Sequence, residues 1–182
     1  MKKQNISSTK KEKKLLIQNS NNILTSPSKY LTNGPYCSDY PISFLRNFSN
    51  YKNYQVSDKL IFKIITDIRN YFNPAKYHTS TTQKKSESRC LPVSVILRRR
   101  LRTCGSIASV SALVLRYLGL PTKLIDGKLK RNGVWRSHAW IEVYLPGKNK
   151  FIPFDAFSAE YKVGRDHRRV ASYNDWSQWC KS

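Results

Sequence analysis

Residues 103–127 read TCGSIASVSALVLRYLGLPTKLIDG, and this stretch predicts a buried helix followed closely by a strand. Thr103 is a suitable N-cap, which places Cys104 in the first turn of the helix. Gly119 and Pro121 end the helix, and TKLIDG has the composition of a short strand. Large apolar side chains recur at helical intervals with alanine and serine between them, so the helix can pack closely against a sheet. These apolar positions are Ile107, Val110, Val114, Leu115 and Leu118.

The next two predicted strands carry a histidine and an aspartate. Residues 136–145, RSHAWIEVYL, alternate with a period of two, which indicates a half-buried strand with His138 near its start. Residues 148–157, KNKFIPFDAF, predict a further strand that carries Asp155. In an antiparallel hairpin around residues 146–147 with an even-length loop, the histidine and the aspartate would lie directly opposite each other. An odd-length loop would send Asp155 to the other face unless a bulge restored the phase.

The beginning of the chain differs in composition from the rest. Residues 1–35 are rich in lysine, asparagine and serine, which predicts a basic, disordered tail, and residues 36–182 are expected to form one domain. Aromatic residues increase over residues 36–54, so we expect this segment to pack onto the domain.

Two helices are predicted ahead of residue 103. Residues 56–72, VSDKLIFKIITDIRNYF, have helical spacing of apolar residues and a candidate N-cap at Ser57. Residues 91–102, LPVSVILRRRLR, predict a short amphipathic helix that ends in a basic run. This run is either a solvated face or a docking surface for a polyanion. It consists of Arg98, Arg99 and Arg100.

The chain is strongly basic, with 33 Lys and Arg against 11 Asp and Glu, for a net charge of +22. Such a surface attracts nucleic acid, anionic lipid or acidic cell-wall polymer. A soluble protein with an ordinary basic background remains the alternative. No stretch has the apolar core of a signal peptide or the length of a transmembrane span, so a cytoplasmic location is expected by default.

Cys104, His138 and Asp155 lie at positions that suit nucleophilic catalysis. A thiol at a helix N-terminus is favoured as the thiolate by the helix dipole. An adjacent imidazole can pair with the thiolate and then protonate a leaving group, and a carboxylate behind the imidazole fixes its tautomer. Each residue alone has an ordinary structural explanation, but their order and their elements together favour the catalytic one.

The remaining cysteines and histidines carry weaker signals. No CxxC pair or His/Cys cluster has zinc-ligand spacing, so neither a metal nor a cofactor is expected. Four cysteines in a chain of this length do not amount to a disulfide scaffold. Cys90 is a competing nucleophile, but it stands 48 residues before His138 and is expected to be structural. His167, in GRDHRRVAS, is expected on the surface.

The segments SVILRRRLRTCGSIASVSALVLRYLGLPTKLIDG and HAWIEVYLPGKNKFIPFDAF together resemble the core of the transglutaminase-like superfamily. The resemblance covers about residues 56–158 and is most specific at His-Ala-Trp and Pro-Phe-Asp. It implies an α+β, papain-like core in which an N-terminally capped catalytic helix packs on an antiparallel sheet. It also implies that Cys104 is the nucleophile, His138 the general acid and base, and Asp155 the orienting carboxylate.

The resemblance further implies that Thr103, Gly105 and Trp140 lie in the substrate and oxyanion neighbourhood. Many family members have glycine where this chain has Thr103, and the chain lacks the upstream tryptophan that helps form the oxyanion site in true transglutaminases. The backbone N–H of Cys104 is one oxyanion donor, and a second donor is not assigned.

The implied function is acyl transfer at amide bonds of a peptide or protein through a thioester on Cys104. Peptide or amide hydrolysis is expected over cross-linking, because the core is simple and the upstream tryptophan is missing. The alternative is a catalytically silent module that binds nucleic acid or another polyanion, which the charge of +22 would suit. The three intact catalytic residues argue against that alternative.

Overall fold

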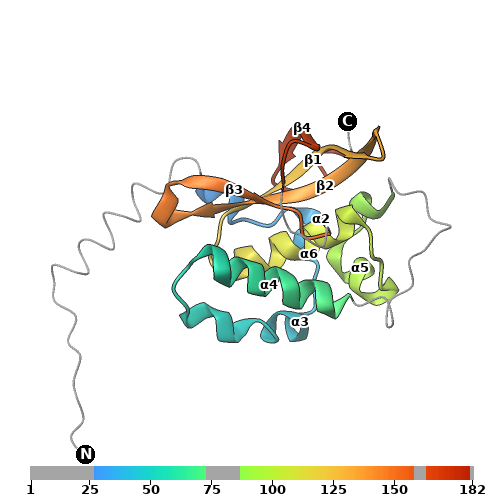
Figure 1. The fold of residues 1–182 in the computed structure, drawn as a ribbon. Coiled ribbons are helices and arrows are strands. Elements are labelled where there is room, and N and C mark those ends of the chain that lie inside the picture. The colour runs from blue at the N-terminus through green and yellow to red at the C-terminus, as the bar shows by residue number, and fades with distance from the viewer. Residues whose placement is uncertain (1–26, 73–86, 158–162, 181–182) are drawn as a thin grey trace, which may run out of the picture.

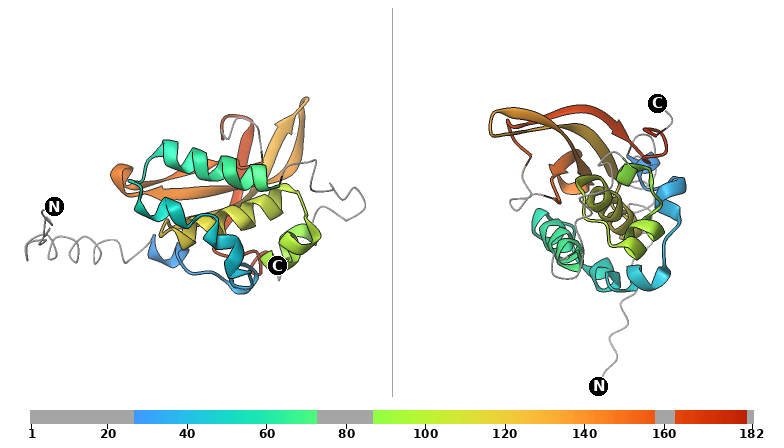
Figure 2. Two further views of the ribbon diagram at one scale, coloured as in Figure 1. Left: turned by 90° about the horizontal axis from the view of Figure 1, so that it is seen from below. Right: turned by 90° about the vertical axis from the view of Figure 1, so that its right-hand side faces the viewer.

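A layer of helices covers one face of a four-stranded sheet in the computed structural model, which describes residues 27–72, 87–157 and 163–180 (Figure 1). Neighbouring strands are all antiparallel, and their order is β3-β2-β1-β4. Two further views show the longer helices gathered on the same side of the sheet (Figure 2). The predicted α+β class, with a capped helix packed on an antiparallel sheet, is confirmed.

Helix α6, Cys104–Tyr117, is the centre of the fold and packs on β1 and β2. Its N-terminus has a capping box, because the Thr103 side chain accepts from the Ser106 backbone N–H and the Ser106 hydroxyl accepts from the Thr103 N–H. The residues from Gly105 to Arg116 are buried. Gly119, with φ of +84°, ends the helix in a conformation that favours glycine.

Three of the four strands follow the sequence prediction. The hairpin of β1 and β2 is longer than expected, and it joins a short β3. The strand β4 was not predicted, because its two arginines and single large aliphatic residue give no clear alternation. The strands are β1 (Thr122–Arg131), β2 (Val134–Leu145), β3 (Lys150–Phe154) and β4 (His167–Tyr173).

The predicted register of β2 against β3 is wrong by two residues. Leu145 pairs with Lys150, so the connection is the four-residue segment 146–149 and not the two-residue turn. Pairing ends at Ile141 and Phe154, before either catalytic candidate is reached, so His138 and Asp155 are not cross-strand partners. A four-residue loop is still even in length, and a shift of two residues keeps side chains on their original face.

The other helices precede α6 in the chain. Ser57 caps α4 by accepting from the Leu60 N–H, as predicted, and α5 forms within the predicted helical segment 91–102. Phe44 and Phe48 are buried, which confirms that the aromatic segment packs onto the domain. The α-helices are α2 (Pro35–Ser38), α3 (Ile42–Arg46), α4 (Asp58–Tyr71) and α5 (Val93–Arg99), and the short 3₁₀ helices are η1 (Ser28–Tyr30), η2 (Ser49–Asn53), η3 (Glu87–Cys90) and η4 (Pro146–Lys148).

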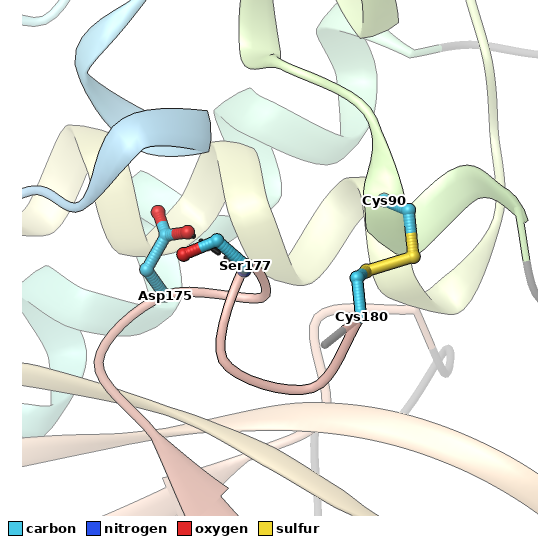
Figure 3. The surroundings of a disulfide bond; sticks show 4 residues. All are labelled: Cys90, Asp175, Ser177 and Cys180. Atoms are coloured by element: carbon cyan, nitrogen blue, oxygen red, sulfur yellow. Dashed lines mark hydrogen bonds between the residues drawn. A yellow bond between two sulfur atoms is a disulfide. The ribbon is translucent and has the colours of Figure 1, made fainter. Parts of the chain in front are cut away.

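Both ends of the described chain lie against this core. Of the predicted tail, residues 1–26 lie outside the described residues, whereas Tyr30 is buried with its ring 5.5 Å from that of Phe151. At the other end, Cys180 forms a disulfide with Cys90, with a Cα–Cα distance of 5.8 Å (Figure 3). The structural role expected for Cys90 is therefore that of a cross-link between η3 and the C-terminal segment.

Among the described residues, no helix has the length and apolar character needed to cross a bilayer.

Candidate active site

Cys104 is a partly exposed thiol at the first residue of α6. The positive end of the helix dipole favours its thiolate. All four cysteines lie among the described residues, and the other thiol outside the disulfide, Cys37, is fully buried. Burial raises the pKa of Cys37 to about 12 and leaves Cys104 as the thiol that can react at neutral pH.

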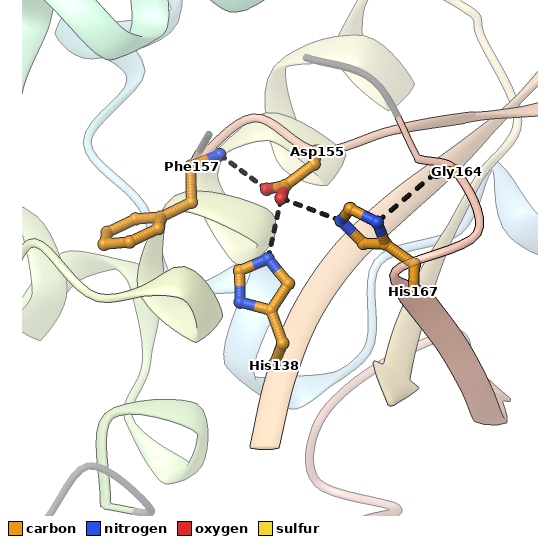
Figure 4. Close-up of polar contacts among 5 residues, drawn as sticks. All are labelled: His138, Asp155, Phe157, Gly164 and His167. Carbon is orange, nitrogen blue, oxygen red and sulfur yellow. Dashed lines mark hydrogen bonds and ion pairs between the residues drawn. The ribbon is translucent and has the colours of Figure 1, made fainter. Parts of the chain in front are cut away.

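His138 lies between Cys104 and Asp155. Its Nε2 is 2.7 Å from Oδ2 of Asp155, which is fully buried just beyond the end of β3 (Figure 4). The side chain of His138 also interacts with that of Cys104, and this interaction lowers the pKa of the thiol. The second oxygen of Asp155, Oδ1, accepts from the Phe157 backbone N–H at 3.0 Å. The three residues therefore form a thiol–imidazole–carboxylate relay.

His167 joins this group, so its expected surface position is wrong. Its Nε2 lies 3.3 Å from Asp155 Oδ2, and its Nδ1 accepts from the Gly164 backbone N–H at 3.3 Å (Figure 4). Because an accepting Nδ1 carries no proton, the ring proton is on Nε2 and points to the carboxylate. The Asp155 carboxylate thus receives hydrogen bonds from two imidazoles. The only hint in the sequence was a histidine at the start of an unrecognised strand.

The electrostatics favour an ion pair between Cys104 and His138. Burial disfavours the thiolate, but the hydrogen bond and charge of His138, the charge of Arg89 and a backbone hydrogen bond from Ala139 together hold the pKa of Cys104 below its ordinary value. Burial also disfavours the imidazolium, yet hydrogen bonds with Asp155 and Cys104 raise the pKa of His138 to about 9. The pKa of Asp155 is lowered despite its burial, chiefly by its hydrogen bond with His138.

Aromatic rings shield the contact between His138 and Asp155 from water. The ring of Trp140 stacks 6.3 Å from His138 and lies edge-on at 5.5 Å from His167, and Phe157 is 6.1 Å from His138. Trp140 also requires Gly127 on the neighbouring strand, where a Cβ would lie 2.3 Å from the indole. The dry surroundings strengthen the hydrogen bond between the imidazole and the carboxylate.

The other predicted site residues divide into two groups. Thr103, Gly105 and Trp140 lie beside the relay, as the N-cap of α6, its second residue and the aromatic neighbour of His138. The basic run lies at the C-terminal end of α5 and is exposed. This run is Arg98, Arg99 and Arg100.

The histidines and Asp155 also form a possible ligand group that the sequence spacing did not reveal. His138, Asp155 and His167 each offer one ligand atom, and these atoms lie within 4.8 Å of one another. In the structure the Nε2 atoms of both histidines lie within hydrogen-bonding distance of Asp155 Oδ2. A carboxylate that hydrogen-bonds an imidazole in this way can orient the ring for acid–base chemistry.

The family model of the transglutaminase-like superfamily matches residues 50–156, more than half of the chain. The chain belongs to the transglutaminase-like superfamily. The match contains Cys104, His138 and Asp155 but ends before His167.

A solved structure supports the fold of this superfamily member. The crystal structure of a candidate cysteine protease from Cytophaga hutchinsonii matches with a TM-score of 0.64 and 17% sequence identity. The match covers 84% of this chain and 48% of that chain, so the superfamily domain spans about half the length of its neighbour. No match is found among curated proteins.

Iodoacetamide should alkylate Cys104 selectively, because its thiolate forms at lower pH than that of an ordinary thiol. Mass spectrometry after labelling at pH 6 should find one modified cysteine, and Cys104→Ala should abolish the label. Replacing His138 by Gln should raise the pH midpoint of labelling, since the paired cation is lost. The matched control, Cys37→Ala, should label as the wild type does. Modification at Cys37, or an ordinary midpoint at Cys104, would contradict the ion pair.

His167→Phe should lower the free energy of unfolding by about 1.5 kcal/mol at neutral pH, because a buried carboxylate loses a donor. The loss should shrink as the pH falls and Asp155 becomes protonated, since its lowered pKa contributes stability only while it is ionised. Urea denaturation at several pH values measures both effects. His167→Gln is the control, because its amide can still donate. Equal stability of wild type and His167→Phe would show that the second imidazole contributes nothing.

Proposed function

We propose that this chain is a cysteine-dependent enzyme that transfers the acyl group of an amide through a thioester on Cys104. The observation that carries the proposal is the position of the His138 ring, which hydrogen-bonds the buried Asp155 carboxylate and interacts with the Cys104 thiol. This is the arrangement that a nucleophile, its base and an orienting group require. Both the shared family and the cysteine protease description of its structural neighbour support it.

The first half of the reaction acylates the enzyme. The Cys104 thiolate attacks the amide carbonyl carbon, and the carbonyl electron pair moves onto the oxygen. When the tetrahedral intermediate collapses, the C–N bond breaks and the proton on His138 Nδ1 passes to the departing amine. The products are a thioester on Cys104, a neutral imidazole and a free amine.

The first turn of α6 favours the oxyanion of this intermediate. The backbone N–H groups at a helix N-terminus have no intrahelical partner, and that of Cys104 is adjacent to the reacting sulfur.

The second half of the reaction removes the acyl group and reverses the proton transfer. Neutral His138 takes a proton from the acceptor, which attacks the thioester carbonyl and releases the Cys104 thiolate. Asp155 stays ionised throughout and stabilises the imidazolium.

Water is the favoured acceptor, so the proposed reaction is peptide or amide hydrolysis. The chain has no tryptophan upstream of Cys104, where true transglutaminases have one that helps form the oxyanion site. The neighbour from Cytophaga hutchinsonii is described as a candidate protease, which supports hydrolysis over cross-linking. Transamidation shares the acylation step and differs only in the acceptor.

Acylation can be tested with p-nitrophenyl acetate, which should give a burst of p-nitrophenolate and an acetyl adduct on Cys104. Replacing Cys104 by Ala should remove the burst and lower turnover about 1,000-fold or more, because the nucleophile is lost. With a peptide amide as the substrate, turnover should fall above pH about 9, where His138 loses the proton that the leaving amine needs. Cys90→Ser/Cys180→Ser should still form the adduct.

The acceptor can be tested with a peptide library and a primary amine such as glycine ethyl ester. Cleavage products that stay the same with added amine support hydrolysis. Stable incorporation of the amine into peptides would replace hydrolysis by transamidation. If the folded protein gives neither an adduct nor cleavage, the proposal that the chain is an enzyme is refuted.

Binding of nucleic acid is a second candidate function. It is favoured by basic and aromatic side chains that lie on neighbouring positions of β1, β2 and β4. Lys128 lies directly opposite Arg168 on the neighbouring strand, and Lys130 lies opposite Trp135. Like charges in such cross-strand pairs repel each other, and a bound polyanion would relieve the repulsion. Trp135 is 43% exposed, so its ring is available to stack on a base. We propose that this surface binds single-stranded nucleic acid.

Lys128→Glu/Arg168→Glu should weaken the binding of a fluorescent single-stranded oligonucleotide at least about tenfold and flatten its salt dependence. The control is Arg46→Glu/Lys59→Glu, which makes the same change of charge on α3 and α4 and should bind as the wild type does. Fluorescence anisotropy at several salt concentrations gives both quantities. Equal losses in the two variants would mean that net charge alone attracts the oligonucleotide, and binding by Cys104→Ala separates this function from catalysis.

A further inference from the structure

Arg89 is a buried cation next to the proposed active site. The residue is 4% exposed, and its guanidinium donates to the carboxylate of Asp126 and, at 3.2 Å, to the hydroxyl of Ser137. Ser137 immediately precedes His138 on β2. Two indole rings cover the guanidinium at 5.2 and 5.0 Å from their centroids, which are those of Trp176 and Trp179.

The Arg89 side chain also runs along the first turn of α6. A Cβ added to Gly105 would lie 2.5 Å from Cγ of Arg89, so only glycine leaves room for the arginine beside Cys104. The aliphatic part of the side chain thus touches the residue after the nucleophile, while its guanidinium lies between β1 and β2. A permanently charged group is therefore fixed close to the reacting sulfur.

The disulfide and the C-terminal segment hold Arg89 in this place. Cys90, the next residue, is bonded to Cys180, which fastens η3 to the segment that carries both tryptophans (Figure 3). Asp175 anchors the same segment, because its carboxylate accepts from the backbone N–H groups of Ser177 at 2.8 Å and Cys37 at 3.1 Å. The cage around the guanidinium is thus closed by a covalent bond and by buried hydrogen bonds.

We propose that Arg89 is a positioning residue whose fixed charge stabilises the Cys104 thiolate, and that the Cys90–Cys180 disulfide holds this charge in place. The inference rests on the proposed function and adds a group to it. A buried arginine with a single carboxylate partner is costly to maintain as a structural element alone, because an apolar side chain could fill the same space. Because Arg89 lies beside Cys104, its charge can stabilise the thiolate.

Few charged groups act on Cys104, so the effect of Arg89 on the pKa of the thiol can be separated from that of the others. His138 from β2 and Arg89 from η3 act on the sulfur, and both lower the pKa of Cys104. Asp126 from β1 faces Arg89, and Asp155, after β3, acts through His138. The first turn of α6 itself carries no charged side chain. Removing Arg89 and removing its carboxylate partner should therefore shift the thiolate in opposite directions.

The test is the pH profile of Cys104 alkylation by iodoacetamide, with folding checked by circular dichroism and thermal melting. Arg89→Met should move the midpoint to higher pH, so that labelling below the midpoint slows about tenfold for each unit of the shift. Arg89→Lys should keep most of the effect, because it keeps the charge. Asp126→Asn should move the midpoint to lower pH, because the guanidinium loses its neutralising partner. The control is Arg98→Met, which removes one exposed arginine and should leave the midpoint unchanged.

A purely structural Arg89 would give a different pattern. Arg89→Met and Asp126→Asn would then shift the midpoint in the same direction or not at all, which would overturn the proposal. If Arg89→Met does not fold, Asp126→Asn decides the question: a midpoint below that of the wild type supports the proposal, and an unchanged or higher midpoint overturns it. An ordinary midpoint in the wild type would refute the proposed function itself, whereas a low midpoint that depends on His138 but not on Arg89 refutes only this inference.

The disulfide is tested with Cys90→Ser/Cys180→Ser in the same assay. Loss of the cross-link should raise the midpoint in the direction of Arg89→Met, because the cage can open. An unchanged midpoint in the folded double variant would overturn the holding role of the disulfide. Because such cross-links persist in oxidising compartments, this role favours one of those over the cytoplasm that the sequence suggested.

Discussion

The hydrogen bond between His138 and the buried carboxylate of Asp155 is the contact on which the rest of the site depends. A buried carboxylate stays ionised only if donors satisfy it, and here the donors are two imidazoles and one backbone N–H. The ionised carboxylate in turn keeps the His138 ring oriented and favours its protonated form. A thiolate at the start of α6 then has a cation to pair with, so the proposed roles of acid, base and nucleophile all depend on this one buried charge.

The sequence predicted the parts of this site that depend on local signals. The N-cap at Thr103, the apolar periodicity of α6 and the alternation of β2 are properties of adjacent residues, and they place the candidate catalytic residues Cys104 and His138 on the predicted elements. The pairing of elements was less predictable. The loop between β2 and β3 is two residues longer than assumed, but side chains in a strand alternate, so an error of two preserved the face on which Asp155 lies.

Features that depend on distant residues escaped the sequence analysis. Nothing around His167 indicates that its strand joins the edge of β1 and reaches Asp155, and nothing around Arg89 indicates that it will be buried. The disulfide joins residues that are 90 positions apart, and cysteine counting alone does not give such a pairing. In each case the missing information was which elements become neighbours.

Each of these features depends on a residue that follows the family match. The family match ends at residue 156, whereas His167, Trp176, Trp179 and Cys180 follow it. The matched range therefore contains the proposed nucleophile, base and carboxylate, and the C-terminal segment completes their surroundings. It brings the second imidazole to Asp155 and the indole cage to Arg89. Because a charge in a dry site acts strongly on its neighbours, a segment that touches none of the reacting atoms can still set the ionisation of the sulfur.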